Sequence, residues 1–267
     1  MNVNGYIRML RIKDWIKFYP LIPLIGAVLA IDTTIFLIFL IFLIFFCSTG
    51  YGFVINNYYD VEIDKKHSKK LMLNKNPLIS GNVSPEGTLV LCGLLIIIPL
   101  LISYFLSVSG FLFTLSSILL LTLYSERKVR LKERYFLDII THGMMFGLFP
   151  FLAGFTLAGG KVNIQIILIS LLFMIIGCEA LLTHQINDYR EDLGNSDTTV
   201  VRVGIRNGWV ILIVLVILSI LSLWLIDYCY KIDPLISAGA FACLLAYPIY
   251  MCRGEIKNDI YNRSSIE

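Results

Sequence analysis

Residues 35–64, IFLIFLIFLIFFCSTGYGFVINNYYDVEID, decide the fold, because an unbroken apolar run ends in a cluster of amides and carboxylates. About 20 mostly apolar residues are enough for a helix to cross a lipid bilayer. A strand of a membrane β-barrel would instead alternate apolar and polar residues. The continuous run therefore predicts a membrane-spanning helix whose polar end lies at the water boundary.

The composition extends this prediction to the whole chain. Of its 267 residues, 57% are hydrophobic and 15% are charged, whereas a soluble domain carries about 25% charged residues. Soluble, disordered and fibrous classes are excluded, which leaves an all-α, multi-span membrane protein. The basic residues flank the apolar runs, so the net charge of +3 does not indicate nucleic-acid binding. The six cysteines form no C-x-x-C pair and are interpreted as small buried side chains.

Eight apolar segments are candidates for membrane spans in a single domain covering residues 1–267. They run approximately over residues 15–31, 34–56, 85–106, 110–124, 136–157, 162–185, 208–226 and 234–251. The first resembles a signal peptide in its length, but it holds two prolines and no A-x-A site, so we expect it in the mature protein. The third begins at Ser84-Pro85, a helix N-cap followed by proline in the first turn.

Basic residues are distributed unevenly between the two sides of these eight spans. All but two of the 22 Lys and Arg residues fall on one side, and the exceptions are Lys161 and Lys231. Because cytoplasmic loops carry the excess of Lys and Arg, both termini and the long loops are predicted to be cytoplasmic. The loops on the other side are short, so we expect the chemistry at the cytoplasmic face.

Two clusters of polar side chains end two of the predicted spans, each with a spacing of four residues that places its members on one helix face. The first cluster is Asn56, Asp60 and Asp64. The second cluster is His184, Asp188 and Asp192. Asp60 and Asp188 are 128 residues apart, which equals four spans and suggests an internal four-plus-four repeat.

The four carboxylates of these clusters would repel one another at an empty site, whereas Mg²⁺ binds oxygen ligands and commonly shares them with substrate phosphates. We therefore predict that the four aspartates bind Mg²⁺ and, through it, a lipid diphosphate whose isoprenoid tail lies among the helices. Asn56 and His184 are predicted to contact the substrate. The alternative is that helix ends carry charges simply because they meet water.

The loop at residues 124–134, YSERKVRLKER, supplies positive charge after the fourth span. A departing phosphate needs cations to stabilise the charge that develops on it. Tyr124 and Lys128, four residues apart, are the candidate catalytic residues of this loop. Further basic residues expected to contact the phosphates are Arg127, Arg130 and Lys75. The alternative is a loop that only contacts anionic lipid headgroups.

Three ionisable residues lie deeper in the predicted spans, where such groups are costly and usually face a cavity or a partner. Asp138 and His142 are four residues apart, and Glu179 lies nine residues before Asp188, about 13 Å along a helix. Each is a candidate for the acceptor pocket or for a proton relay. The structural alternatives are a mutual Asp138–His142 pair and, for Glu179, a protonated carboxyl in the core.

These motifs resemble the UbiA superfamily of intramembrane prenyltransferases over nearly the whole chain. NNYYDVEID matches N-x-x-x-D-x-x-x-D, and DYRED matches D-x-x-x-D. YSERK, NPLISG and TTVVRVG are similar to the Y-x-x-x-K, R-P-x-x-S-G and T-x-x-x-x-x-G elements. The resemblance implies an all-helical fold that opens laterally to lipid, a Mg²⁺-bound prenyl diphosphate at the two aspartate motifs, and a role for Tyr124 and Lys128 in ionisation.

The chain departs from the family pattern in three respects. Asn57 stands where an acidic residue is often seen, and Asn76 replaces the arginine before the proline. Lys75 is the candidate substitute for that arginine, although a lysine does not bind a phosphate through two parallel hydrogen bonds as an arginine does. The family usually has nine spans against the eight counted here, which puts acceptor contacts from a ninth helix in doubt.

The leading hypothesis is Mg²⁺-dependent transfer of a prenyl group from its diphosphate to an apolar acceptor through an allylic carbocation. One alternative is a terpene cyclase on the same scaffold, with Glu179 or His142 as terminal base. Another is a transporter, although transporters place charges near the midplane and break their helices there. The acceptor stays open among aromatic quinone precursors, prenylglyceryl phosphates, carotenoids and porphyrin-type alcohols, as do the prenyl chain length and the oligomeric state.

Overall fold

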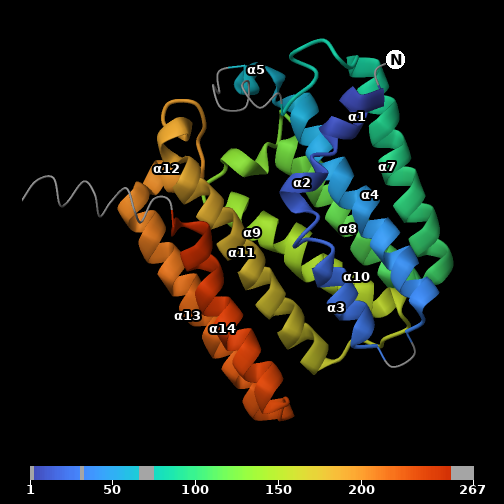
Figure 1. Cartoon of the computed structure of the whole chain (residues 1–267), viewed down its shortest axis with the longest axis vertical. Helices are drawn as coiled ribbons and strands as arrows, with labels where there is room; N and C mark the ends of the chain where they lie inside the picture. The colour runs from blue at the N-terminus through green and yellow to red at the C-terminus, as the bar shows by residue number, and fades with distance from the viewer. Residues whose placement is uncertain (1–2, 31–32, 66–74, 254–267) are drawn as a thin grey trace, which may run out of the picture. The chain divides into compact units, whose positions relative to one another are not determined.

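The computed structural model describes residues 3–30, 33–65 and 75–253, and within these ranges the chain is helical, without strands (Figure 1). Lys66, Lys69 and Lys70, counted above as cytoplasmic, lie outside the described residues. The helices of the first half are α1 (Val3–Met9), α2 (Ile12–Trp15), α3 (Leu21–Val28), α4 (Ile35–Tyr59), α5 (Val61–Asp64), α7 (Pro85–Leu106) and α8 (Val108–Ser125). Those of the second half are η1 (Leu131–Glu133), α9 (Leu137–Gly143), η2 (Met144–Leu148), α10 (Phe149–Leu157), α11 (Ile164–Asp192), α12 (Thr199–Val203), α13 (Ile205–Tyr230) and α14 (Pro234–Met251).

Seven segments of the described chain are long and apolar enough to cross a membrane. They are α4, α7, α8, the run from α9 through η2 to α10, α11, α13 and α14. The all-helical membrane fold is thus confirmed, with a span count close to the predicted eight. The predicted segment 15–31 differs, because it holds the eight-residue α3 instead of a long helix. Pro20 is the N-cap of α3, and a proline cannot donate the hydrogen bond that would continue a helix from α2.

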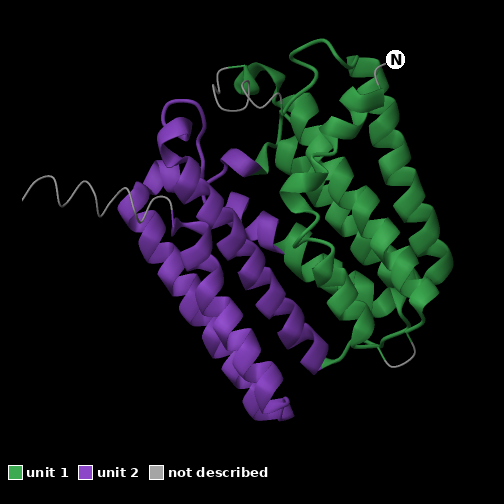
Figure 2. Cartoon of the chain, viewed as in Figure 1, with its two compact units in different colours: residues 1–131, 144–163 green, residues 132–143, 164–267 purple. Residues whose placement is uncertain are grey.

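The chain divides into two compact units (Figure 2). Unit 1 comprises Met1–Leu131 and Met144–Asn163, and unit 2 comprises Lys132–Gly143 and Ile164–Glu267. Asn56, Asp60, Asp64 and the Tyr124–Arg130 segment belong to unit 1, whereas Asp138, Glu179, Asp188 and Asp192 belong to unit 2.

In unit 1, α4 packs against α7 and α8, and α3 packs against α10. The core between α4, α7 and α8 includes Val54, Leu95 and Ile118. The α3–α10 contact depends on Gly154, because a Cβ there would meet the backbone carbonyl of Pro23. This close approach anchors the short α3 within the unit.

In unit 2, α11 packs against α9, α12, α13 and α14. Its core includes Leu182, Ile186 and Val200, all fully buried. The packing holds the polar C-terminal turns of α11 against α12, which begins seven residues after Asp192.

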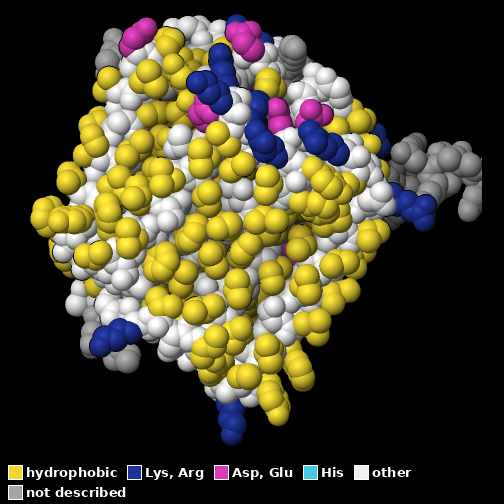
Figure 3. Space-filling view, turned by 180° about the vertical axis from the view of Figure 1, so that it is seen from behind, with side chains coloured by type: hydrophobic (Ala, Val, Ile, Leu, Met, Phe, Trp, Pro, Cys, Tyr) yellow, Lys and Arg dark blue, Asp and Glu magenta, His cyan; other side chains and the backbone are white. Residues whose placement is uncertain are grey.

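Hydrophobic side chains cover most of the molecular face drawn in Figure 3. Large apolar residues that are exposed in the single chain include Phe105 on α7 and Trp224 on α13. A soluble monomer rarely exposes such extensive apolar surface. The surface is therefore that of a protein solvated by lipid.

Candidate active site

The first polar cluster lies where α4 ends and the short helix α5 follows. Helix α4 ends at Tyr59, and its N-cap is Thr34, whose side chain accepts a hydrogen bond from the amide of Leu37. Asp60 leaves the helical conformation, so the chain bends between the two helices. Asp60 is 4% exposed and Asp64 is 2% exposed. Burying carboxylates at this depth is costly unless they have polar or charged partners.

The structure supplies such partners from other segments of unit 1. Arg130 Nη2 lies 3.1 Å from Asp60 Oδ1 and forms an ion pair with it. Asn76 Nδ2 donates to Asp64 Oδ2 at 2.9 Å. Ser125 Oγ, on the last turn of α8, donates to Asn56 Oδ1 at 3.2 Å. Three segments distant in sequence therefore meet at the first cluster.

Asn76 and Ser125 were not predicted as site residues. The sequence marks Asn76 only as a replacement for arginine, and Ser125 only as the neighbour of Tyr124. Asn76 is neutral, whereas an arginine at this position would carry a positive charge. The negative charge of Asp64 is therefore left for another cation to neutralise.

Within the basic loop, Arg130 pairs with Asp60 of the cluster. Its backbone has φ of 45°, in the left-handed region that a residue with a side chain seldom adopts. Such strain tends to be kept at functional positions. Lys128 and Arg127 are exposed on the turn, and Glu126 Oε2 accepts from the Lys128 amide at 2.8 Å. Tyr124 is half-buried on α8.

Lys75, which was expected to contact the phosphates, forms an ion pair with Asp14 on α2. Its Nζ lies 3.1 Å from Asp14 Oδ2, and Arg11 Nη2 lies 2.8 Å from the same oxygen. Burial raises the pKa of the Asp14 carboxyl, but the two cations outweigh that effect and hold its pKa below the usual value. Lys75 thus fastens the segment after the first cluster to α2.

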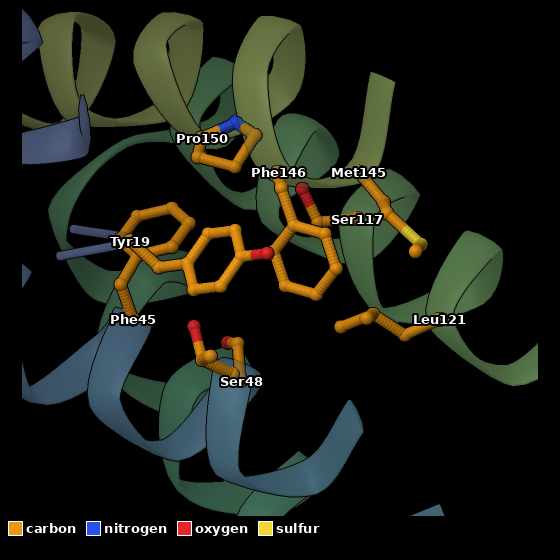
Figure 4. Close-up of a pocket in the computed structure, with 9 residues that line it drawn as sticks. Tyr19, Phe45, Ser48, Ser117, Leu121, Met145, Phe146 and Pro150 are labelled. Atoms are coloured by element: carbon orange, nitrogen blue, oxygen red, sulfur yellow. The ribbon is translucent and has the colours of Figure 1, made fainter. Parts of the chain in front are cut away.

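A small pocket lies deeper in unit 1, between α4, α8, η2 and α10 (Figure 4). Its lining consists of Tyr19, Phe45, Ser48, Thr49, Ser117, Leu121, Met145, Phe146 and Pro150. Thr49 lies seven residues before Asn56, which places it on nearly the same face of α4 and about 10 Å along the axis. Ser117 is 1% exposed, and its hydroxyl oxygen has no hydrogen-bond partner among the described residues.

The second polar cluster lies on the C-terminal turns of α11 in unit 2. Asp188 and Asp192 are half-buried, and His184 is exposed. The Asp192 carbonyl accepts from the amides of Asn195 and Ser196 at 2.9 and 3.0 Å. These bonds begin the turn that leads to α12.

The three deeper residues are all buried in unit 2. Asp138 is fully buried, and its carboxylate bonds to α11 and α12. His142 Nδ1 lies 2.8 Å from the carbonyl oxygen of Gly177 on α11. Glu179 is 1% exposed, and its Oε1 has no partner within the described ranges. Such an oxygen can accept a hydrogen bond from a ligand or from water.

No group of three or more His, Cys, Asp or Glu side chains in the described part of the chain forms a ready metal site. The two aspartate pairs belong to different units of the chain. Their donors are carboxylate oxygens, joined in the first cluster by the Asn56 amide. A site with only a few oxygen ligands from the protein suits Mg²⁺, because Mg²⁺ keeps several bound waters and takes further ligands from substrate phosphates.

Comparisons with known proteins agree on one family. Residues 21–262 match the UbiA prenyltransferase family. A digeranylgeranylglyceryl phosphate synthase of Sulfurisphaera tokodaii is 26% identical over 228 residues, which cover 83% of this chain and 78% of that protein.

Solved structures of a UbiA homolog from Archaeoglobus fulgidus have the same fold. The form bound to GPP and Mg²⁺ has a TM-score of 0.78 at 20% identity and covers 93% of this chain and 86% of that one. The form bound to DMAPP and Mg²⁺ has a TM-score of 0.80 at 22% identity, with coverage of 92% and 86%.

Proposed function

The chain belongs to the UbiA prenyltransferase family, and from that premise we propose that it transfers a prenyl group from a Mg²⁺-bound prenyl diphosphate to an apolar acceptor within the membrane. The observation that carries the proposal is the first cluster. Two aspartates are buried at the end of a membrane-spanning helix, and Arg130 is paired with one of them. That combination of anionic metal ligands and a cation suits a diphosphate.

The chain's own residues divide the work of breaking the donor's C–O bond. When bound, Mg²⁺ would neutralise the diphosphate and stabilise the charge on the departing oxygen. In unit 1 we propose Asp60 and Asp64 as the residues that hold Mg²⁺. For unit 2 we propose Asp188 and Asp192 as metal-binding residues in their own right. Arg130, with Lys128 and Arg127 on the same loop, stabilises the diphosphate as it leaves with the bonding electrons. Tyr124 and Asn56 orient the donor.

The prenyl chain is left as an allylic cation, which water would quench. We propose that the prenyl chain lies against the aromatic and aliphatic side chains around the small pocket in unit 1, such as Phe45, Leu121 and Phe146, which keep water from it. A nucleophilic carbon or oxygen of the acceptor then forms the new bond and gives up its proton. We propose Glu179 and His142, both in unit 2, as the residues that serve this second half-reaction by taking up that proton.

The acceptor is tested first with a prenylglyceryl phosphate, because the relative from Sulfurisphaera tokodaii is named for a product of that class. An aromatic quinone precursor and a reaction without acceptor complete the comparison. Labelled prenyl diphosphates of several lengths serve as donors. A product heavier than its acceptor by whole isoprene units identifies both substrates.

Chelation tests the metal requirement. Since the proposed site presents carboxylates to an anionic diphosphate, excess chelator should stop pyrophosphate release, and added Mg²⁺ should restore it. The measurement is pyrophosphate release from membranes containing the protein, with protein-free membranes as the control. Undiminished turnover in excess chelator would contradict the proposal.

We also propose that both termini and the aspartate clusters face the cytoplasm, as the distribution of basic residues predicts. The test replaces exposed Cys229 and Cys243 by serine and introduces Lys161→Cys or Asn195→Cys at the two ends of α11. A membrane-impermeant thiol reagent should label position 161 in intact spheroplasts and position 195 only after permeabilisation. The reverse pattern would place the clusters on the outer face.

A further inference from the structure

Asp138, at the first turn of α9, has its carboxylate occupied by four donors from unit 2. Its Oδ1 accepts from the Ile139 amide at 2.8 Å and from Thr199 Oγ1 at 2.5 Å. Its Oδ2 accepts from Gln185 Nε2 at 2.7 Å and from the Thr199 amide at 2.8 Å. A fully buried carboxylate whose two oxygens already accept four hydrogen bonds has little capacity left for a substrate.

Two further bonds close this network. Gln185 Oε1 accepts from the Val200 amide at 3.2 Å, and Thr199 Oγ1 accepts from the Phe136 amide at 2.9 Å. Asp138 therefore satisfies amides at the starts of both α9 and α12, which would otherwise be buried without acceptors.

In the sequence, Asp188 and Asp192 lie between two residues of this network. Gln185 lies on α11 three residues before Asp188, and Thr199 begins α12 seven residues after Asp192. Between them, the Asp192 carbonyl holds the amides of Asn195 and Ser196. The end of α11 and the turn that follows it are thus fastened on both sides to one carboxylate of α9.

We propose that Asp138 is a positioning residue that fixes the C-terminal turns of α11, and with them the geometry of Asp188 and Asp192. The proposal rests on the function proposed above for those two aspartates. It replaces a direct substrate contact by Asp138 with an indirect role through Gln185 and Thr199. Asp138 acts on the aspartates as an outer hydrogen-bonding partner acts on a metal ligand.

Asp138→Asn is the decisive variant. Both carboxylate oxygens of Asp138 accept hydrogen bonds, so the asparagine NH₂ group would face hydrogen-bond donors in either orientation of the side chain. Thr199→Val is a milder second variant that removes both hydroxyl bonds, the one donated to Asp138 and the one accepted from the Phe136 amide. It keeps the side-chain volume and the bond from the Thr199 amide to Asp138. Ser170→Ala is the control. Ser170 lies on α11, the helix that also carries Gln185, and is fully buried. It donates to the Ile167 carbonyl and belongs neither to the network nor to the proposed site.

Two readouts apart from turnover separate positioning from general stability. The first is Mn²⁺ binding in the presence of a non-hydrolysable prenyl diphosphate analogue, followed by electron paramagnetic resonance. The second is hydrogen exchange of the amides at residues 193–200. We expect Asp138→Asn to weaken Mn²⁺ binding by about tenfold or more and to speed exchange of these amides. Thr199→Val should show smaller changes of the same kind, and Ser170→Ala neither.

Asp188→Asn distinguishes failure of this proposal from failure of the proposed function. If Asp188→Asn loses Mn²⁺ binding while folded Asp138→Asn and Thr199→Val bind like the wild type, only the positioning role is refuted. If Asp188→Asn itself binds like the wild type, the function proposed for the cluster fails and the positioning role fails with it.

Discussion

Asp60→Asn is expected to lower kcat/KM for prenyl transfer by roughly 10²–10³-fold, which corresponds to about 3–4 kcal/mol of transition-state stabilisation. Asp60 is 4% exposed and pairs with Arg130. The amide removes a charge that a Mg²⁺ ligand needs and also removes the carboxylate partner of the arginine. The loss should appear in donor ionisation, measured as pyrophosphate release without acceptor.

Glu62→Gln is the matched control, since Glu62 lies between the two aspartates but is exposed and pairs with Lys65. It should leave kcat/KM unchanged. Arg130→Gln, alone and combined with Asp60→Asn, completes a double-mutant cycle. If the pair acts as a unit, the double variant loses less than the product of the single losses. Wild-type ionisation by folded Asp60→Asn would refute the role of the first cluster.

Local sequence patterns predict the membrane helices well, because length, capping and apolar content are local properties. The Ser84-Pro85 pattern shows this: α7 begins at Pro85, and the Ser84 hydroxyl accepts from the Gly87 amide. The segment at residues 15–31 shows the limit. Its apolar content suggests a span, but its prolines and the close contact of α3 with α10 through Gly154 give a short helix.

The spacing of four residues also predicts which side chains share a helix face, but it does not reveal their partners. Arg130 pairs with Asp60 across 70 residues of sequence, after a backbone turn with positive φ that no residue type in the loop signals. The sequence ranks Lys128 first because of its distance from Tyr124.

Asp138 illustrates the same limit in unit 2. Its spacing from His142 suggests a mutual pair, whereas its hydrogen bonds reach Gln185 and Thr199, 47 and 61 residues away. These contacts form because α9 packs against α11, and no short sequence motif predicts that packing. The buried ionisable groups are therefore easy to find from sequence, but their functions are not.

Asp188→Asn and Glu179→Gln are expected to impair different steps of the reaction. Asp188 lies on the C-terminal turns of α11, where we propose that it holds the donor's metal, so its variant should lose donor ionisation by about 10²–10³-fold. Glu179 lies nine residues earlier on the same helix and is buried, with one oxygen that has no partner in the described structure. Its variant should spare ionisation and slow acceptor coupling, by about 10²-fold if the carboxyl moves a proton.

The two steps are separated by following a radiolabelled prenyl diphosphate to pyrophosphate, free prenol and prenylated acceptor. Glu179→Gln should release pyrophosphate at the wild-type rate while prenol accumulates at the expense of the coupled product. Glu191→Gln, an exposed carboxyl change on α11, is the control for Asp188→Asn and should alter neither step. If the protein is a cyclase, the Glu179→Gln variant should instead convert the prenyl diphosphate to hydrocarbons that differ from the wild-type product, and no acceptor should be consumed. Equal loss of ionisation in both variants would show that Glu179 serves the donor and would remove it from the acceptor step.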